Sequence, residues 1–227
     1  MFDFRFYEIW RSEEFVQALL SGAWTSFWLS AIGGMMGFTL GLMLAISQDK
    51  SVFWGLRYTA RSYIEVIRNT PFIVQLFFVA FDLPLLLDYQ WSFYASALLA
   101  ITLNFSAYFA EVVRSGIDAI DKGQLEASKS LCLTKWQTLK DIVLPQALVK
   151  VYPSLTSQFI FLFLTTGLVS EISVEDLTWA GRFISDRNFR DFEVFIVLTV
   201  IYILLAWLFK LIFQLVKRFA FPWTVDK

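Results

Sequence analysis

The stretch Glu126-Ala127-Ser128-Lys129-Ser130-Leu131-Cys132, followed by Ile142 and by Leu144-Pro145, decides how this chain is read. It is short, polar and charged, yet the segments before and after it are too hydrophobic for a soluble protein. A polar segment of this kind must lie in water, outside the bilayer in which its hydrophobic neighbours lie. We therefore expect an aqueous loop, covering residues 116–150, between two membrane-spanning helices.

Two helix-start signals divide this loop. Asp121 can cap one helix, with Gln124 three residues later, and Thr134 can cap a second, with Gln137 at the same offset. This spacing is typical of a capping box, in which the two side chains satisfy each other's backbone N–H groups. Pro145 marks the end of the second helix or a kink in it. The loop is therefore predicted to be a helix-turn-helix.

The composition places the whole chain in the membrane class. Hydrophobic residues make up 57% of its 227 residues, and the mean hydropathy is +0.59. The single cysteine, Cys132, excludes an internal disulfide and a cysteine-cluster metal site. The absence of histidine removes the usual general base and the commonest transition-metal ligand. We therefore expect no metal site and no catalytic residue.

Uncharged stretches locate the spans. A spanning helix needs about 20 mostly apolar residues. Phe15 to Gln48, Tyr89 to Ala110, Val151 to Ser170 and Val194 to Phe209 carry no charge, and Pro71 to Leu87 carries only Asp82. The sequence predicts an all-α integral membrane protein with one domain, residues 1–227. Its five spans are expected at approximately 18–47, 63–87, 89–111, 151–171 and 193–216.

Positive charges set the orientation. One side of the five-span arrangement holds Lys50, Arg57, Arg61, Arg68, Arg114, Lys122, Lys129, Lys135, Lys140, Lys150, Lys210, Lys217, Arg218 and Lys227. The other side holds only Arg5, Arg11, Arg182, Arg187 and Arg190. Because cytoplasmic loops carry the excess of Lys and Arg, the loop 116–150 and the C-terminus are predicted to be cytoplasmic and the N-terminus external.

Gly33, Gly37 and Gly41 recur at four-residue intervals in the first span, with Gly34 beside them. A helix face without side chains lets another helix backbone approach closely. We expect this face to pack against another span of the same chain. The alternative is a seam between two copies of the chain.

The exposed end of the helix-turn-helix, Ala127 to Leu131, has small and polar residues that suit a groove on a partner protein. The residues alone leave a second interpretation open, in which an amphipathic hairpin lies on the bilayer surface. A DNA-reading helix-turn-helix is disfavoured because acidic and basic residues alternate and form no basic face.

The hairpin resembles the cytoplasmic loop by which permease subunits of ATP-binding cassette (ABC) importers dock onto their ATPase. That loop usually reads Glu-Ala-Ala, then Gly, then Ile-x-Leu-Pro. Residues 64–78 (IEVIRNTPFIVQLFF), 107–117 (AYFAEVVRSGI), 123–127 (GQLEA) and 144–147 (LPQA) are similar to importers of polar amino acids. The resemblance covers roughly residues 26–177 of the chain.

The resemblance implies the ABC type I importer transmembrane fold, with residues 116–150 as the coupling loop. The ATPase-docking residues that it implies are Gly123, Glu126, Ala127, Ser128, Leu131 and Cys132. It also implies that two ATPase subunits bind ATP and Mg, because this sequence has no Gly-x4-Gly-Lys-Ser/Thr pattern of its own. The other implied partners are a second permease, identical or homologous, and an extracytoplasmic amino-acid-binding protein. No cofactor and no nucleic acid is expected on this chain.

Two positions depart from the family pattern. Cys132 stands where the loop usually has Gly, and a side chain costs about 1 kcal/mol in the left-handed conformation expected there. Leu164-Thr165-Thr166-Gly167-Leu168 stands where the subfamily tends to have Lys-Asp-Thr-Ser-Leu. The loss of that Lys and Asp removes charge from the membrane interior and leaves open which substrate is carried.

Polar residues inside the spans are candidates for the transport pathway, because they are costly in a bilayer unless they serve a purpose. Asn104, Tyr108 and Glu111 share one face of the third span by their spacing. The full candidate set is Gln75, Asn104, Tyr108, Glu111, Thr165 and Thr166. Two of these have structural alternatives: Glu111 can pair with Arg114, which we favour, and Asn104 can make an interhelical hydrogen bond. Glu65 and Arg68 are also expected to pair.

The sequence therefore predicts a permease subunit of an ATP-driven importer of polar or charged amino acids in the bacterial inner membrane. One alternative is a self-sufficient secondary transporter or channel for small polar solutes, which would need no docking hairpin and would usually show an internal repeat. Another is an intramembrane enzyme, which the missing histidine disfavours.

Overall fold

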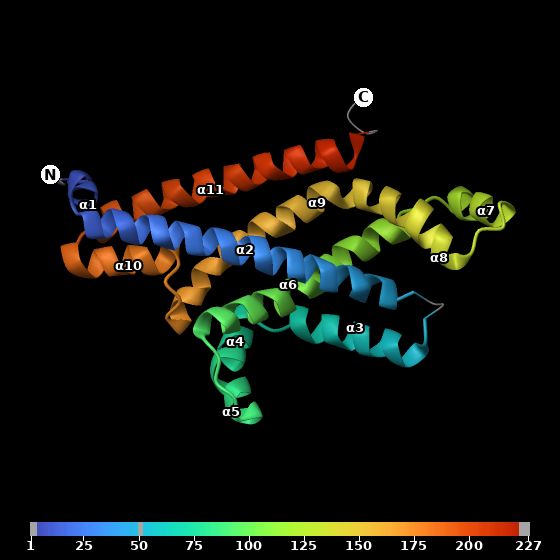
Figure 1. Ribbon diagram of the computed structural model, residues 1–227, viewed down its shortest axis with the longest axis horizontal. Helices are drawn as coiled ribbons and strands as arrows, with labels where there is room; N and C mark the ends of the chain where they lie inside the picture. The colour runs from blue at the N-terminus through green and yellow to red at the C-terminus, as the bar shows by residue number, and fades with distance from the viewer. Residues whose placement is uncertain (1–3, 50–51, 223–227) are drawn as a thin grey trace.

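The computed structural model describes residues 4–49 and 52–222, and every regular element in these ranges is helical (Figure 1). The expectation of an all-α protein is confirmed. Lys50 and Lys227, two of the charges used to predict the orientation, lie outside the described residues.

The α-helices follow one another with three distorted segments between them. In chain order the elements are α1 (Tyr7–Arg11), α2 (Glu13–Ser47), α3 (Trp54–Arg68), α4 (Phe72–Phe77), the π-helical η1 (Phe78–Asp82), α5 (Leu83–Leu87), α6 (Phe93–Asp118), α7 (Lys122–Ser130), α8 (Lys135–Gln137), the π-helical η2 (Thr138–Val143), α9 (Leu144–Thr165), the 3-10 helix η3 (Thr166–Ile172), α10 (Leu177–Asn188) and α11 (Asp191–Ala220).

Within residues 4–49 and 52–222, four helical stretches are long and apolar enough to cross a membrane, and a bent helix pair makes a fifth candidate. The four are α2, α6, α11 and the run from Lys135 to Ile172 that contains α9. In Figure 1 these helices run lengthwise beside one another, with α11 along one edge. The hairpin of α7 and α8 lies at one end, and α1 and α10 lie at the other.

The second span is not one continuous helix. Residues 63–87 were expected as a single span, but α3 and the α4–α5 stretch meet at an angle of 108°. The break falls at Asn69, Thr70 and Pro71. Proline has no N–H to donate to the helix ladder and disfavours helical backbone in the residue before it, so α3 ends at Arg68 and a new helix begins after Pro71.

Aromatic side chains fill the centre of the bundle. Phe105 and Phe109 on α6 and Phe163 on α9 are fully buried. Phe209 of α11 joins them, with its ring centroid 5.1 Å from that of Phe163. Leu29 of α2 belongs to the same cluster, so four of the long helices share one apolar core, which fixes α6 and α9 relative to each other.

The glycine face of α2 packs inside this chain. A Cβ atom at Gly41 would lie 2.7 Å from the backbone oxygen of Ser106 on α6, and one at Gly33 would lie 2.8 Å from Ile101. A Cβ at Gly34 would overlap the Phe159 ring of α9. The prediction of packing between spans of the same chain is confirmed.

The second hairpin helix was expected to end or to be kinked at Pro145, and of these two alternatives the end is not observed. The capping box of Thr134 and Gln137 is present, as expected. The helix does not end at Pro145, however, because η2 leads directly into α9. Pro145 lies in the first turn of α9, where its missing N–H is tolerated after the widened π-helical turns. The hairpin is therefore continuous with the fourth span.

The glycine seam makes a testable prediction, because two glycines one turn apart meet different surroundings. A Cβ at Gly37 would have its nearest neighbour at 3.4 Å, an ordinary contact, whereas one at Gly41 would meet backbone. Gly41→Ala should lower the stability of the purified protein in detergent by about 1–3 kcal/mol through overpacking. Gly37→Ala, the matched control, should be neutral or slightly stabilising. Thermal unfolding measures both, and equal midpoints would contradict the backbone contact at Gly41.

Candidate functional site: a coupling hairpin and a polar groove

The predicted docking residues lie on and around α7. Gly123, Glu126, Ala127 and Cys132 are exposed, and Leu131 is exposed to 71%. Ser128 differs from the rest because it is only 3% exposed and its hydroxyl donates to the Leu125 carbonyl oxygen at 2.8 Å. Five of the six predicted residues are therefore free to contact a partner, while Ser128 stabilises the hairpin from inside.

Apolar side chains surround the exposed end of the hairpin. Leu131 and Trp136 are 71% and 62% exposed, and Leu125 is 37% exposed. Exposed large apolar side chains on an otherwise polar hairpin are typical of a protein contact surface. The charged Glu126 and Lys129 lie on the same short helix.

Cys132 closes α7 in the left-handed conformation that its place in the loop predicts, with φ of 54°. The N–H of Leu133 donates to the carbonyl oxygen of Ser128 at 3.1 Å, and the N–H of Cys132 donates to that of Lys129 at 2.9 Å. These two bonds form a Schellman motif, the usual helix end with a glycine at the left-handed position. The turn is therefore retained although a cysteine side chain occupies that position.

The base of the hairpin is tied to the spans. Lys150 Nζ donates to the Ala119 carbonyl oxygen at 2.7 Å, and Gln146 donates to Gln124 at 3.2 Å. A small apolar cluster of Ile120, Val143 and Ala147 lies beneath. The hairpin is thus attached to the end of α6 and to the start of α9.

A polar groove lies at the break in the second span. It has a volume of about 750 Å³, within the range of small-molecule sites, and four structural regions line it. Its lining residues come from the α3–α4 break, α6, α9 and η3: Arg68, Asn69, Thr70, Pro71, Phe72, Asn104, Phe105, Tyr108, Phe161, Leu164, Thr165 and Leu168.

The groove brings together three of the six predicted pathway residues: Asn104, Tyr108 and Thr165. Gln75 and Glu111 are not among the lining residues, but each contacts a residue that lines the groove. Thr166 is fully buried, and its hydroxyl donates to the Phe163 carbonyl oxygen, so it is part of the core.

Asn104 also makes the interhelical hydrogen bond that was its alternative role. Its amide donates to Gln75 Oε1 at 2.9 Å. Gln75 in turn donates to the Ile67 carbonyl oxygen at 2.8 Å and to the Thr70 hydroxyl at 2.6 Å. Gln75 therefore provides partners for backbone and side-chain groups at the break, and Asn104 joins the break to α6.

Glu111 forms the expected pair with Arg114, through two hydrogen bonds of 3.1 and 2.9 Å. Arg114 also donates to Asp118 at 2.9 Å. Arg68 does not follow its prediction: it was expected to pair with Glu65, but its guanidinium lies 3.4 Å from Glu111. The bend after Arg68 brings the end of α3 against α6, and this explains the change of partner.

Sequence reasoning missed Arg68, Asn69 and Thr70 as groove residues. Arg68 was assigned to a surface pair because helical spacing places it three residues after Glu65. The available signal was Asn69-Thr70-Pro71 itself, since a helix break within a span tends to face a cavity or other protein rather than lipid.

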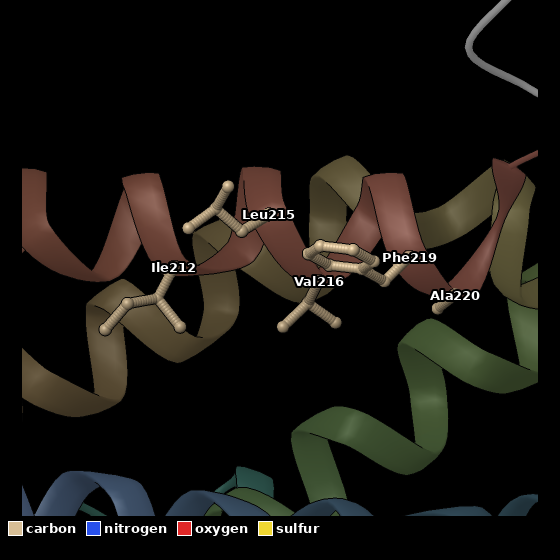
Figure 2. Close-up of a pocket in the computed structure, with 5 residues that line it drawn as sticks. All are labelled: Ile212, Leu215, Val216, Phe219 and Ala220. Carbon is tan, nitrogen blue, oxygen red and sulfur yellow. The ribbon is translucent and has the colours of Figure 1, made fainter.

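A second hollow, of about 460 Å³, lies along the last turns of α11 and has a different character. Figure 2 shows its lining side chains, Ile212, Leu215, Val216, Phe219 and Ala220, all of them hydrocarbon. A surface lined by hydrocarbon side chains on a spanning helix suits lipid chains and offers no side-chain group for chemistry. Within residues 4–49 and 52–222, no cluster of three or more His, Cys, Asp or Glu could hold a metal ion.

Known proteins match this chain along most of its length. The permease protein GlnP of the Escherichia coli K12 glutamine transport system is 32% identical over 204 residues, which cover 89% of this chain and 93% of that protein. A putative GlnP of Rickettsia typhi is 30% identical and covers 88% and 91%.

Solved structures agree with the sequence matches. A crystal structure of an amino acid ABC transporter with histidines superposes with a TM-score of 0.84 at 29% identity, over 96% of this chain and 99% of that one. An inward-facing MetNI methionine ABC transporter gives a TM-score of 0.78 at 20% identity, over 92% and 99%, which supports the fold alone. The expected ABC type I importer fold is confirmed.

The family model for the inner membrane component of binding-protein-dependent transport systems matches residues 37–221. Proteins of this family work with a separate ATPase and a binding protein, so the chain itself is not an enzyme. This chain belongs to that family and is an inner-membrane permease subunit of an ABC importer.

Proposed function

We propose that this permease carries polar or charged amino acids and that the groove at the α3–α4 break forms part of the pathway. The observation that carries the proposal is the meeting of Asn104, Tyr108 and Thr165 in one groove of a largely apolar bundle. The two relatives named for glutamine transport and the superposed amino acid transporter support this substrate class. Uptake of a panel of radiolabelled amino acids by the reconstituted importer tests it.

A self-sufficient secondary transporter or channel is not favoured. Such a protein would have no use for a hairpin with exposed Leu131 and Trp136 that is fastened to two spans. The family assignment points the same way.

The complete importer would contain two ATPase subunits, which bind ATP and Mg, and a second permease, identical or homologous to this one. An extracytoplasmic binding protein would deliver the amino acid. In this assembly the hairpin docks onto an ATPase through Gly123, Glu126, Ala127, Leu131 and Cys132. Its ties to α6 and α9 support a rigid contact, which is what transmission of ATPase closure to the spans requires.

The proposed orientation has the N-terminus external and the C-terminus cytoplasmic in a bacterial inner membrane. The positions of α1 and of the α7–α8 hairpin at opposite ends of the bundle are consistent with it (Figure 1). The positive charges of the hairpin, Lys122, Lys129 and Lys135, then lie on the cytoplasmic side.

The docking proposal predicts that Ala127→Trp and Glu126→Lys abolish transport and substrate-stimulated ATP hydrolysis together. Tryptophan would overfill the contact at an exposed alanine. The substitution at Glu126 would reverse a charge at the rim of the contact, where truncating one partner of a buried charge pair costs about 2–5 kcal/mol. Lys140→Glu, an equal charge reversal at an exposed residue outside the docking set, is the control. Normal uptake by both hairpin variants would refute the docking assignment.

The orientation predicts that Cys132 reacts with thiol reagents only from the cytoplasmic side. Wild-type protein in intact cells should not be labelled by an impermeant maleimide, whereas inverted vesicles should be. An Asp88→Cys variant in a Cys132→Ser background should give the reverse pattern, because Asp88 is exposed after α5 and lies between the second and third expected spans. The opposite labelling would overturn the topology.

The pathway proposal predicts that Asn104→Leu changes the rate or the substrate selectivity of uptake. The substitution removes an amide from the groove wall and its hydrogen bond to Gln75, but it leaves the hairpin intact. Co-purification of the ATPase should therefore be unchanged. If uptake and selectivity both match the wild type, Asn104 has only a packing role.

A further inference from the structure

Arg68 occupies a special place in the groove. It is the last residue of α3, directly before the break, and among the described residues it is the only charged one that lines the groove. Its guanidinium carbon lies 5.7 Å from the centroid of the Tyr108 ring, within the range of a cation–π contact. Its side chain is 43% exposed, so the tyrosine supports it from one side while the other remains accessible.

The positive charge of Arg68 is only partly compensated. Glu111 Oε2 lies 3.4 Å from Arg68, but the same carboxylate makes two shorter hydrogen bonds to Arg114. Arg114 has Asp118 as a second partner, whereas Arg68 has no other ion pair and no hydrogen bond among the described residues. A guanidinium has five N–H donors, so most of those of Arg68 remain available.

The rest of the lining cannot neutralise this charge. The side chains around Arg68 are amide, hydroxyl, aromatic or aliphatic, and the lining residues within the described part of the chain include no carboxylate. The Tyr108 hydroxyl makes no hydrogen bond to another described residue. The groove therefore offers a cation and a hydroxyl donor that together suit an anion.

We propose that Arg68 binds the α-carboxylate of the transported amino acid, with Glu111 and the Tyr108 ring holding its guanidinium in place. A planar guanidinium binds a carboxylate through two parallel hydrogen bonds, an arrangement that lysine cannot reproduce.

This inference rests on the proposed function, because it needs the groove to be part of the pathway. It goes further by making Arg68 a specificity-determining residue. It also limits which end of the substrate the groove binds. Glu111 already pairs with two arginines and is not assigned to the substrate's ammonium group, so the groove is assigned only the carboxylate end. The groove should select for the carboxylate and tolerate different amino-acid side chains.

The test compares a free amino acid with its α-carboxamide, which lacks the negative charge. L-glutamine, L-glutamate, L-histidine and L-arginine, each with its α-carboxamide, are bound to the solubilised complete importer without its binding protein. Arg68→Gln should weaken binding of the free acids on the order of tenfold or more and leave carboxamide binding nearly unchanged. Arg68→Lys, which keeps the charge but not the planar fork, should fall between wild type and Arg68→Gln.

Arg61→Gln is the matched control, because it removes the same charge from an exposed site on α3 that does not line the groove. It should leave the binding of both ligands unchanged. Retained ATPase association and basal ATP hydrolysis establish that each variant is folded. Equal weakening of free acids and carboxamides by Arg68→Gln, or weakening of neither, would overturn the inference.

The Asn104→Leu variant distinguishes failure of the Arg68 inference from failure of the proposed function. If Asn104→Leu alters amino-acid binding while Arg68→Gln does not, the groove remains the proposed substrate site and only the role assigned to Arg68 is refuted. If neither variant alters binding, the groove is not the site and both proposals fall.

Discussion

The close approach of α2 to α6 is the contact on which the rest of the molecule depends. In a bilayer there is little hydrophobic drive between helices, so association relies on close packing. Gly41 and Gly33 bring the α2 backbone against α6, and Phe105 and Phe109 extend α6 into the shared core. Because α2 holds α6 on one face, the position of α6 is fixed relative to the α3–α4 break and to α9, which it contacts with its other faces. Residues on those other faces of α6 line the groove.

The break after Arg68 shows how a membrane protein tolerates irregular backbone. Polar groups without partners are expensive at membrane depth, so a break persists only where protein satisfies them. Here Gln75 donates to both Ile67 and Thr70, and Asn104 donates to Gln75. The residues that make the break possible therefore also shape the groove. This explains why Asn104 has a structural partner and still lines the groove, two roles that the sequence presented as alternatives.

Features set by local chemistry could be predicted, whereas features set by the meeting of distant segments could not. The capping box at Thr134, the left-handed turn at Cys132 and the glycine seam each follow from residues within one helix turn or one helix face. The partner of Arg68 was mispredicted because the 108° bend brings it to Glu111, 43 positions further along the chain. The short helix α10, which Asp176 caps, was also missed, because it is too short and polar to resemble a span. The docking and pathway roles of individual residues stay predictions.

The arrangement along α6 gives a physical reason for linking the groove to the hairpin. Tyr108 lines the groove, Glu111 and Arg114 follow on the next turn, and Asp121 begins the hairpin. The helix continues from Tyr108 to Asp118, a distance of about 15 Å at 1.5 Å per residue. A helix of this length that is packed along α2 moves as a unit, so a displacement of the hairpin base reaches the groove wall. Since Glu111 also contacts Arg68, the same displacement acts on the guanidinium at the break, on the opposite side of the groove.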